Sequence, residues 1–250
     1  MNDLPEPIPA ATLILMRPGV DAPELLMVER AGHMAFAAGA MVFPGGRIDP
    51  ADHQAVSALS DAPEDAPARI AAIRETIEET GLCPGLAPEP TPSQAVRLRE
   101  AISHRSLAMV IAEESLSFDL EALTPFARWC PNFRETRRFD TLFYLAEAPS
   151  DAIDATPDRT EGVRIIWASA ASVLADADAG HSAIIFPTRR NLERLARFAS
   201  IEEARADAAR HPVRRITPWV EERGGGKWVC IPEGIGYPVT AERFETARRR

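Results

Sequence analysis

Residues 74–82 read Arg-Glu-Thr-Ile-Glu-Glu-Thr-Gly-Leu, and they determine how the rest of the chain is interpreted. Placed on a helix, which turns by about 100° per residue, this stretch continues an apolar stripe made of Ile70, Ile73 and Ile77. Gly81 suits the left-handed position that follows the end of a helix. The sequence therefore predicts an amphipathic helix that packs its isoleucines inward and ends at Gly81.

The opposite face of this helix carries three glutamates, Glu75, Glu78 and Glu79, at spacings of three and four residues. Carboxylates this close repel one another and cost helix stability unless something neutralises them. Hard divalent cations such as Mg²⁺ or Mn²⁺ remove the repulsion, because they prefer clustered carboxylate oxygens. Taken alone, the run is more typical of a solvated acidic face, so the metal interpretation depends on the residues upstream.

Those upstream residues are the glycine loop Phe43-Pro44-Gly45-Gly46 and the acid Asp52. Loop, acid and helix together resemble the Nudix box, in which a glycine, five residues, a glutamate and seven residues lead into Arg-Glu-x-x-Glu-Glu-x-Gly and an aliphatic residue. Gly46 takes the position of the first glycine, and Asp52 takes that of the first glutamate. The second half of the box is filled by Arg74, Glu75, Glu78, Glu79, Gly81 and Leu82.

The chain departs from the box in two ways. Asp52 is one methylene shorter than the usual glutamate, and 21 residues, 53–73, separate it from Arg74 where the family has seven. An interrupted box is known in one branch of the family, the coenzyme A diphosphatases of the peroxisomal type and their bacterial relatives. This chain looks like that branch.

The segment before the box is also similar to that branch. The shared positions are Arg30, Ala31, Gly39 and the loop 43–46. Ala35 stands where one form of the branch signature has a second arginine. This difference weakens the assignment of coenzyme A as the substrate but leaves the resemblance to Nudix hydrolases unchanged.

The resemblance implies an α+β fold, the α/β/α sandwich of the Nudix family around a mixed sheet, formed by residues 1–250 as a single domain. It implies a metal-dependent hydrolase of nucleoside diphosphate derivatives, with coenzyme A or acyl-CoA favoured and 3′,5′-ADP and a phosphopantetheine as products. The enzyme alternative is a diphosphatase of ADP-ribose, NADH or a sugar nucleotide. The alternative from another class is a non-catalytic nucleotide sensor on the same fold, although such a protein is expected to lose box glutamates.

Roles within the box follow from the same resemblance. Glu75 and Glu79 are the strongest candidate ligands of Mg²⁺ or Mn²⁺, and Glu78 is a ligand or the catalytic base. Arg74 orients the acidic residues, with Asp52 as its partner. Many Nudix enzymes add a glutamate from a distant loop.

For that distant glutamate the first candidate here is Glu161, with Glu147 and Asp158 behind it. Arg137 and Arg138 are candidates for contact with an anionic substrate, and the alternative is that one or both pair with nearby acids.

Candidate substrate contacts also lie before and within the glycine loop. Arg30 and Phe43 are the candidates outside the glycines, and Gly45 and Gly46 allow the backbone to turn and approach a phosphate closely.

Patterning assigns the other segments. Strands at 11–16 and 25–29 are predicted to form a hairpin. Further strands are predicted within 129–145 and at 161–167, and a closing hairpin is predicted within 216–237. Helices are predicted at 169–177, from Thr188 to Phe198, and after Ser200. Residues 53–66 form a surface loop with up to one helical turn, inserted in the box, with Asp65 capping the following helix. Residues 93–126 form a helical insertion that covers the substrate cleft or makes a homodimer surface.

Composition excludes several other classes of protein. The chain has 250 residues and a formal net charge of −9, which argues against general binding to nucleic acid. No apolar run approaches the roughly 20 residues of a membrane span, and the N-terminus has no signal pattern. Three widely spaced cysteines indicate neither a disulfide framework nor a zinc site. A cytoplasmic protein that acts on a small nucleotide is the expectation.

Overall fold

The computed structural model describes residues 5–32, 39–132, 138–150, 155–158 and 161–248. Its helices are α1 Pro50–Val56, α2 Ala66–Thr80, α3 Pro92–Ile102, α4 Leu107–Glu113, the 3₁₀ helix η1 Leu120–Ala122, α5 Ala170–Asp178, α6 Phe186–Leu195, α7 Ile201–Arg210 and α8 Phe244–Arg248. Its strands are β1 Ile8–Arg17, β2 Glu24–Arg30, β3 Met41–Val42, β4 Gly45–Arg47, β5 Leu86–Ala87, β6 Ser117–Phe118, β7 Thr124–Trp129, β8 Phe139–Glu147, β9 Gly162–Ser169, β10 Arg215–Ile216, β11 Trp219–Arg223, β12 Gly226–Cys230 and β13 Ala241–Arg243.

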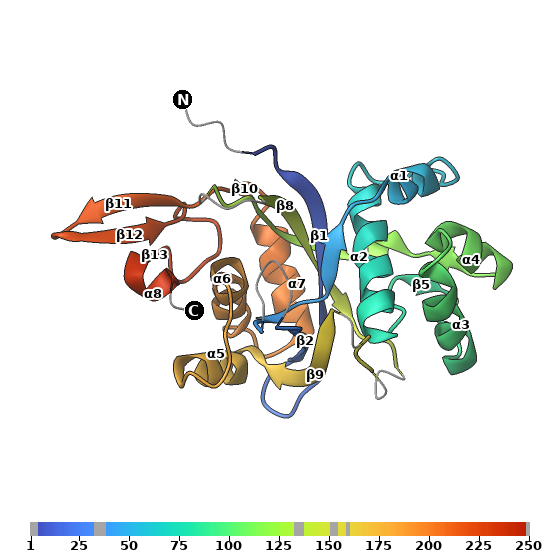
Figure 1. The fold of residues 1–250 in the computed structure, drawn as a ribbon, viewed down its shortest axis with the longest axis horizontal. Helices are drawn as coiled ribbons and strands as arrows, with labels where there is room; N and C mark the ends of the chain where they lie inside the picture. The colour runs from blue at the N-terminus through green and yellow to red at the C-terminus, as the bar shows by residue number, and fades with distance from the viewer. Residues whose placement is uncertain (1–4, 33–38, 133–137, 151–154, 159–160, 249–250) are drawn as a thin grey trace.

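The main sheet is mixed and is built around β1. Among the described residues it runs in the order β10-β7-β8-β1-β2-β3, with β4 added to β1 and β9 added to β2. β1 pairs in parallel with β8 and antiparallel with β2, as the predicted hairpin requires. The helices α1 to α4 lie on one side of this sheet and α5 to α7 on the other (Figure 1). The predicted α+β sandwich of helices around a mixed sheet is therefore confirmed.

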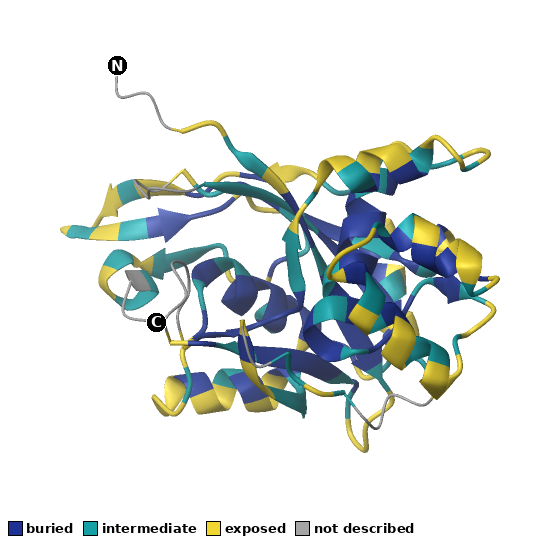
Figure 2. Cartoon of the chain, turned by 45° about the vertical axis from the view of Figure 1, so that its right-hand side comes forward, coloured by how far each residue is buried: buried dark blue, intermediate teal, exposed yellow. Residues whose placement is uncertain are grey.

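Alternating side chains of β1 supply both cores of the sandwich. Leu13 and Leu15 belong to the core shared with α2, whereas Ile14 and Met16 belong to the core shared with α5, α6 and α7. All four are buried, as the dark interior of Figure 2 shows. Complete burial of such side chains stabilises the fold by about 1.5–3 kcal/mol each. This double burial explains why β1 reads as a continuous apolar run rather than as alternating apolar and polar residues.

One edge of β1 changes its partner along the strand. Residues 10–12 pair with β4, whereas Met16 and Arg17 pair with β2. Between these pairings, the amide of Leu13 donates a hydrogen bond to the carbonyl of Pro44 over 3.0 Å. The glycine loop is thereby fixed against the central strand.

The helix predicted from the isoleucine stripe is α2. Ile70, Ile73 and Ile77 are fully buried, and Gly81 follows the helix in the left-handed conformation with φ of 76°. The predicted cap is wrong: Asp65 occupies the N-cap position, but its carboxylate makes no capping hydrogen bond. The carboxylate instead accepts a hydrogen bond from Nε of Arg69, one turn later in the helix, and another from the hydroxyl of Tyr144 on β8.

The two insertions are only partly as predicted. Segment 53–66 is a loop for most of its length, but it starts inside α1, which begins at Pro50. Helix is present in the second insertion as α3 and α4, but the prediction of helix to residue 126 is wrong beyond Glu113. Residues 124–129 instead form β7, because pairing with β8 satisfies their backbone in the sheet. The apolar residues there fit a short buried strand as well as a helix.

The remaining predicted elements are present. α5 and α7 follow the predicted starts, α6 begins two residues early at Phe186, and β11 and β12 form the closing hairpin. None of the helices that the structure describes is both long and apolar enough to cross a lipid bilayer.

Candidate active site

A cleft of about 820 Å³ opens where β1, β4, α2 and the turn between α3 and α4 meet. Its acidic lining includes Glu75, Glu78 and Glu161. Its basic lining includes Arg30, Arg47, Arg74, Arg105 and Arg138. An apolar wall is formed by Phe43, Phe139, Phe143, Ile185 and Pro187. Positive, negative and apolar groups thus share one cavity of the size that holds small-molecule ligands.

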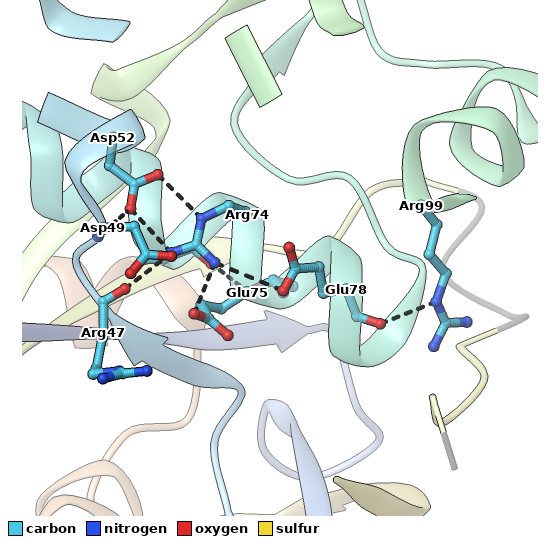
Figure 3. Close-up of polar contacts among 9 residues, drawn as sticks. Arg47, Asp49, Asp52, Arg74, Glu75, Glu78 and Arg99 are labelled. Carbon is cyan, nitrogen blue, oxygen red and sulfur yellow. Dashed lines mark hydrogen bonds and ion pairs between the residues drawn. The ribbon is translucent and has the colours of Figure 1, made fainter. Parts of the chain in front are cut away.

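Arg74 lies at the centre of the acidic cluster and bonds to several of its members (Figure 3). Its Nε and Nη2 donate to the two carboxylate oxygens of Asp52 over 3.1 and 3.0 Å, and its Nη1 donates to Glu75 over 2.8 Å. A further bond from Nη2 reaches the backbone carbonyl of Arg47 over 2.9 Å. Burial alone would lower the pKa of Arg74, but the bonds to Asp52 and the charge of Glu75 outweigh it and raise the pKa. The side chain is therefore a permanent cation.

The box insertion explains how the shorter Asp52 still reaches Arg74. Asp52 lies in the first turn of α1, and its carboxylate also accepts a 2.8 Å hydrogen bond from the amide of Asp49. The packing of α1 against α2 brings this carboxylate to the guanidinium, and Asp52 is only 2% exposed. The position of α1 thus compensates for the missing methylene, because it places the shorter Asp52 side chain within bonding distance of Arg74.

The glutamates of α2 lie in an environment that disfavours their charged forms. Burial raises the pKa of Glu75 to about 7, despite the neighbouring Arg74, and burial also raises the pKa of Glu78. The pKa of Glu79 is raised well above its usual range by burial and by the charge of Glu75. Oε2 of Glu79 is buried and has no hydrogen-bond partner among the described residues.

These carboxylates fit the chemistry of a hard divalent cation. No three acidic, imidazole or thiol groups in the described part of the chain already stand as a complete coordination cage. Nevertheless, one oxygen of Glu79 is unpaired among the described residues, and the pKa values of all three glutamates are raised. The surrounding protein therefore supplies too little positive charge to balance the three carboxylates in their ionised form. Oxygen donors of this kind are the ligands that Mg²⁺ and Mn²⁺ prefer.

The glycines of the loop are required first by internal packing. A Cβ on Gly46 would lie 2.3 Å from Oε1 of Glu75, and a Cβ on Gly45 would lie 2.4 Å from the carbonyl oxygen of Ala11. Both residues also line the cleft. Gly46 therefore lets the Glu75 carboxylate lie directly on the loop backbone.

The structure brings the distant Glu161 to the cluster. It lines the cleft, lies 4.0 Å from Nη2 of Arg30, and contributes to the raised pKa values of the three glutamates of α2. The carboxylate of Asp158 accepts hydrogen bonds from the amides of Glu161 and Gly162, so Asp158 holds this loop. The other candidate, Glu147, lies 3.6 Å from Arg205 and is not part of the cleft lining.

The predicted substrate contacts Arg30, Phe43 and Arg138 all line the cleft. Nε of Arg30 and Nε of Arg138 are buried, and neither has a hydrogen-bond partner within the described ranges. Arg137, the other arginine named from the sequence, lies outside the described residues.

The sequence left open whether the insertion at 93–126 covers the cleft or makes a homodimer surface, and it singled out no residue there. Residues 102–106, from the end of α3 into the turn before α4, line the cleft. The turn carries His104 and Arg105, and Arg105 pairs with Glu113 of α4. No local motif marks it, because its position depends on how α3 packs against α2.

Comparison with known proteins agrees with the fold and with the resemblance of the box. No family model matches the chain. The chain is 27% identical over 243 residues to the acyl-coenzyme A diphosphatase NUDT19 of Homo sapiens, a match that covers 74% of this chain and 64% of the human protein. The structure is similar to the crystal structure of a Nudix hydrolase from Alicyclobacillus acidocaldarius, with a TM-score of 0.69 and 26% identity, covering 80% of this chain and 96% of that one.

Proposed function

We propose that this chain, which has the Nudix fold and resembles Nudix hydrolases in sequence, is a Mg²⁺- or Mn²⁺-dependent hydrolase that cleaves the diphosphate of a nucleoside diphosphate derivative. The observation that carries the proposal is the cluster of Glu75, Glu78 and Glu79 on α2, in which Arg74 bonds to Glu75, Glu75 and Glu78 line the cleft, and Glu79 is buried beside them. All three glutamates of the helix are present, which favours an enzyme over a non-catalytic nucleotide sensor.

The carboxylates of Glu75, Glu78 and Glu79 would hold the cation, which when bound neutralises phosphate oxygens and lowers the pKa of a water molecule. Arg74 holds one oxygen of Glu75, and its two bonds to Asp52 keep the guanidinium in place beside the cluster. The unpartnered Nε groups of Arg30 and Arg138 would then donate to the oxygens of the substrate.

Water attacks one phosphorus of the anhydride, a P–O bond to the bridging oxygen breaks, and the second phosphate leaves with that oxygen. The attacking water gives its proton to a carboxylate. Glu161 and Glu78 are the candidates for this base, because both line the cleft and Glu78 is a part-exposed member of the cluster.

Within this class we favour coenzyme A or an acyl-CoA, cleaved to 3′,5′-ADP and phosphopantetheine or its acyl derivative. The pre-box segment, the interrupted box and the similarity to the human acyl-coenzyme A diphosphatase support this substrate. The apolar wall of Phe43, Phe139 and Phe143 offers a surface for a base or for a pantetheine chain. ADP-ribose, NADH or a sugar nucleotide is the alternative substrate class. A cytoplasmic location and a homodimer remain predictions.

The test compares purified protein on coenzyme A and on ADP-ribose, with and without Mg²⁺, by following release of 3′,5′-ADP or AMP. We expect Mg²⁺-dependent release of 3′,5′-ADP from coenzyme A, and its absence removes the favoured substrate. Glu79→Gln should lose activity by about a hundredfold or more while remaining folded. Glu100→Gln, on the exposed face of α3, is the matched control and should keep the parent rate.

A further inference from the structure

The last turn of α2 is held by one arginine of the helical insertion. Arg99 of α3 donates from Nε to the carbonyl of Glu78 over 3.0 Å (Figure 3). Its Nη2 donates to the carbonyl of Glu79 over 3.3 Å. The adjacent Leu98 is fully buried in the core shared with α2, which fixes where on α3 the guanidinium emerges.

A helix leaves its last four carbonyls without partners inside the helix, and here each of the four has one. The carbonyl of Ile77 accepts from the amide of Gly81, and that of Thr80 accepts from the amide of Thr156. The two between them, those of Glu78 and Glu79, accept from Arg99. The end of the helix therefore depends on α3 and on the segment before β9.

Arg99 also joins these two supports to each other. Its Nη1 donates to Oγ1 of Thr156 over 2.8 Å, in the segment that leads through Asp158 to Glu161. A positive charge at the C-terminal end of a helix is favourable, because it offsets the negative end of the helix dipole. Gly81 leaves room for this side chain, since a Cβ there would lie 3.2 Å from Nη1 of Arg99.

We propose that Arg99 is a positioning residue for the metal site, and that the helical insertion acts through it to fix Glu78 and Glu79 relative to the Glu161 segment. This inference rests on the proposed function. Glu75 lies one turn earlier, where Arg74 and Gly46 hold it. Loss of Arg99 should therefore make the backbone at Glu78 and Glu79 more mobile, weaken cation binding by these two residues, and leave the hydrophobic core intact.

The test measures Mn²⁺ binding by calorimetry and backbone hydrogen exchange of α2 in the metal-free protein. We expect Arg99→Ala to weaken Mn²⁺ binding about tenfold or more and to speed exchange at residues 78–81. Arg99→Lys keeps the charge but not the three-donor fork, so its affinity should lie between those of the parent and Arg99→Ala.

Arg97→Ala is the matched control, since Arg97 lies on the same helix and its guanidinium pairs with Glu114, the residue that follows α4. It should leave Mn²⁺ binding and exchange at residues 78–81 unchanged. Parent-like Mn²⁺ affinity in folded Arg99→Ala, or in Arg99→Lys if the alanine variant does not fold, overturns the proposal. If the parent itself binds no Mn²⁺, the proposed function fails, and the exchange measurement still decides whether Arg99 holds the helix end.

Discussion

The guanidinium of Arg74 makes a two-bond ion pair with Asp52, at 3.1 and 3.0 Å, between side chains of which 9% and 2% are exposed. Breaking a buried pair by removing one partner leaves an uncompensated charge and typically costs about 3–5 kcal/mol. We expect Asp52→Asn to lower the free energy of unfolding by about 3 kcal/mol in urea titrations, since Glu75 still pairs with Arg74.

Asp49→Asn is the control for that measurement. Asp49 lies 3.7 Å from Arg74 and is half exposed, so its removal should cost less than about 1 kcal/mol. If both variants lost the same free energy of unfolding, the buried Asp52 pair would stabilise the protein no more than the half-exposed Asp49 does.

The raised pKa values of the glutamates predict an unusual pH dependence of stability. Burial holds the pKa of Glu75 at about 7, and those of Glu78 and Glu79 are raised as well. The metal-free native state thus keeps protons that the unfolded chain releases, so this contribution is complete at low pH and is lost as pH rises through the folded pKa.

We therefore expect the Tm of chelator-treated protein to fall between about pH 5 and pH 8, and added Mg²⁺ to raise Tm more at the higher pH. Glu79→Gln should reduce the fall. A Tm that rises across this range, in parent and variant alike, would contradict the assigned environment of the cluster.

Alanine at the two loop glycines should have different effects. A Cβ on Gly46 meets the Glu75 carboxylate, the movable end of a side chain, whereas a Cβ on Gly45 meets the backbone of β1. Gly46→Ala should keep its Tm within a few degrees and lose Mn²⁺ affinity, while Gly45→Ala should unfold at a clearly lower temperature. Gly32→Ala has open space around its Cβ and serves as the neutral control.

Arg138 is expected to contribute to substrate binding rather than to stability. Its buried Nε has no hydrogen-bond partner among the described residues, and a charge-assisted bond to a phosphate is worth about 1.5–3 kcal/mol. Arg138→Ala should raise KM about tenfold or more with a small change in Tm. Arg164→Ala, at an exposed arginine on β9, should leave KM unchanged.

Features that depend on residues close in sequence were predictable. The isoleucine stripe and Gly81 identified α2 and its end, and the glycine loop with the following helix identified the box. Asp65 was misassigned because a capping residue and a side chain that bonds across the core look alike in sequence. Arg69 lies one turn along the same helix, whereas the bond from Tyr144 depends on the packing of α2 against β8.

Features that depend on packing between distant segments were not predictable from the residues alone. Glu161 entered through a family resemblance, since no local pattern connects it with α2. Arg99 and the individual residues of the turn at 102–106 gave no signal, because α3 reaches the helix end only after the chain has folded. Residues 124–126, the first half of β7, were read as the end of a helix, because the pairing of β7 with β8 decides the outcome.

The parallel pairing of β1 with β8 bears on how the chain assembles during synthesis. Ile8 faces Phe139, and the register continues to Met16 facing Glu147, so the paired strands are about 130 residues apart in the chain. Contacts at such separation slow folding, because a long loop must close before they form. We expect the first apolar strand to leave the ribosome long before its partner, so that the nascent N-terminus needs shielding from aggregation until β8 emerges.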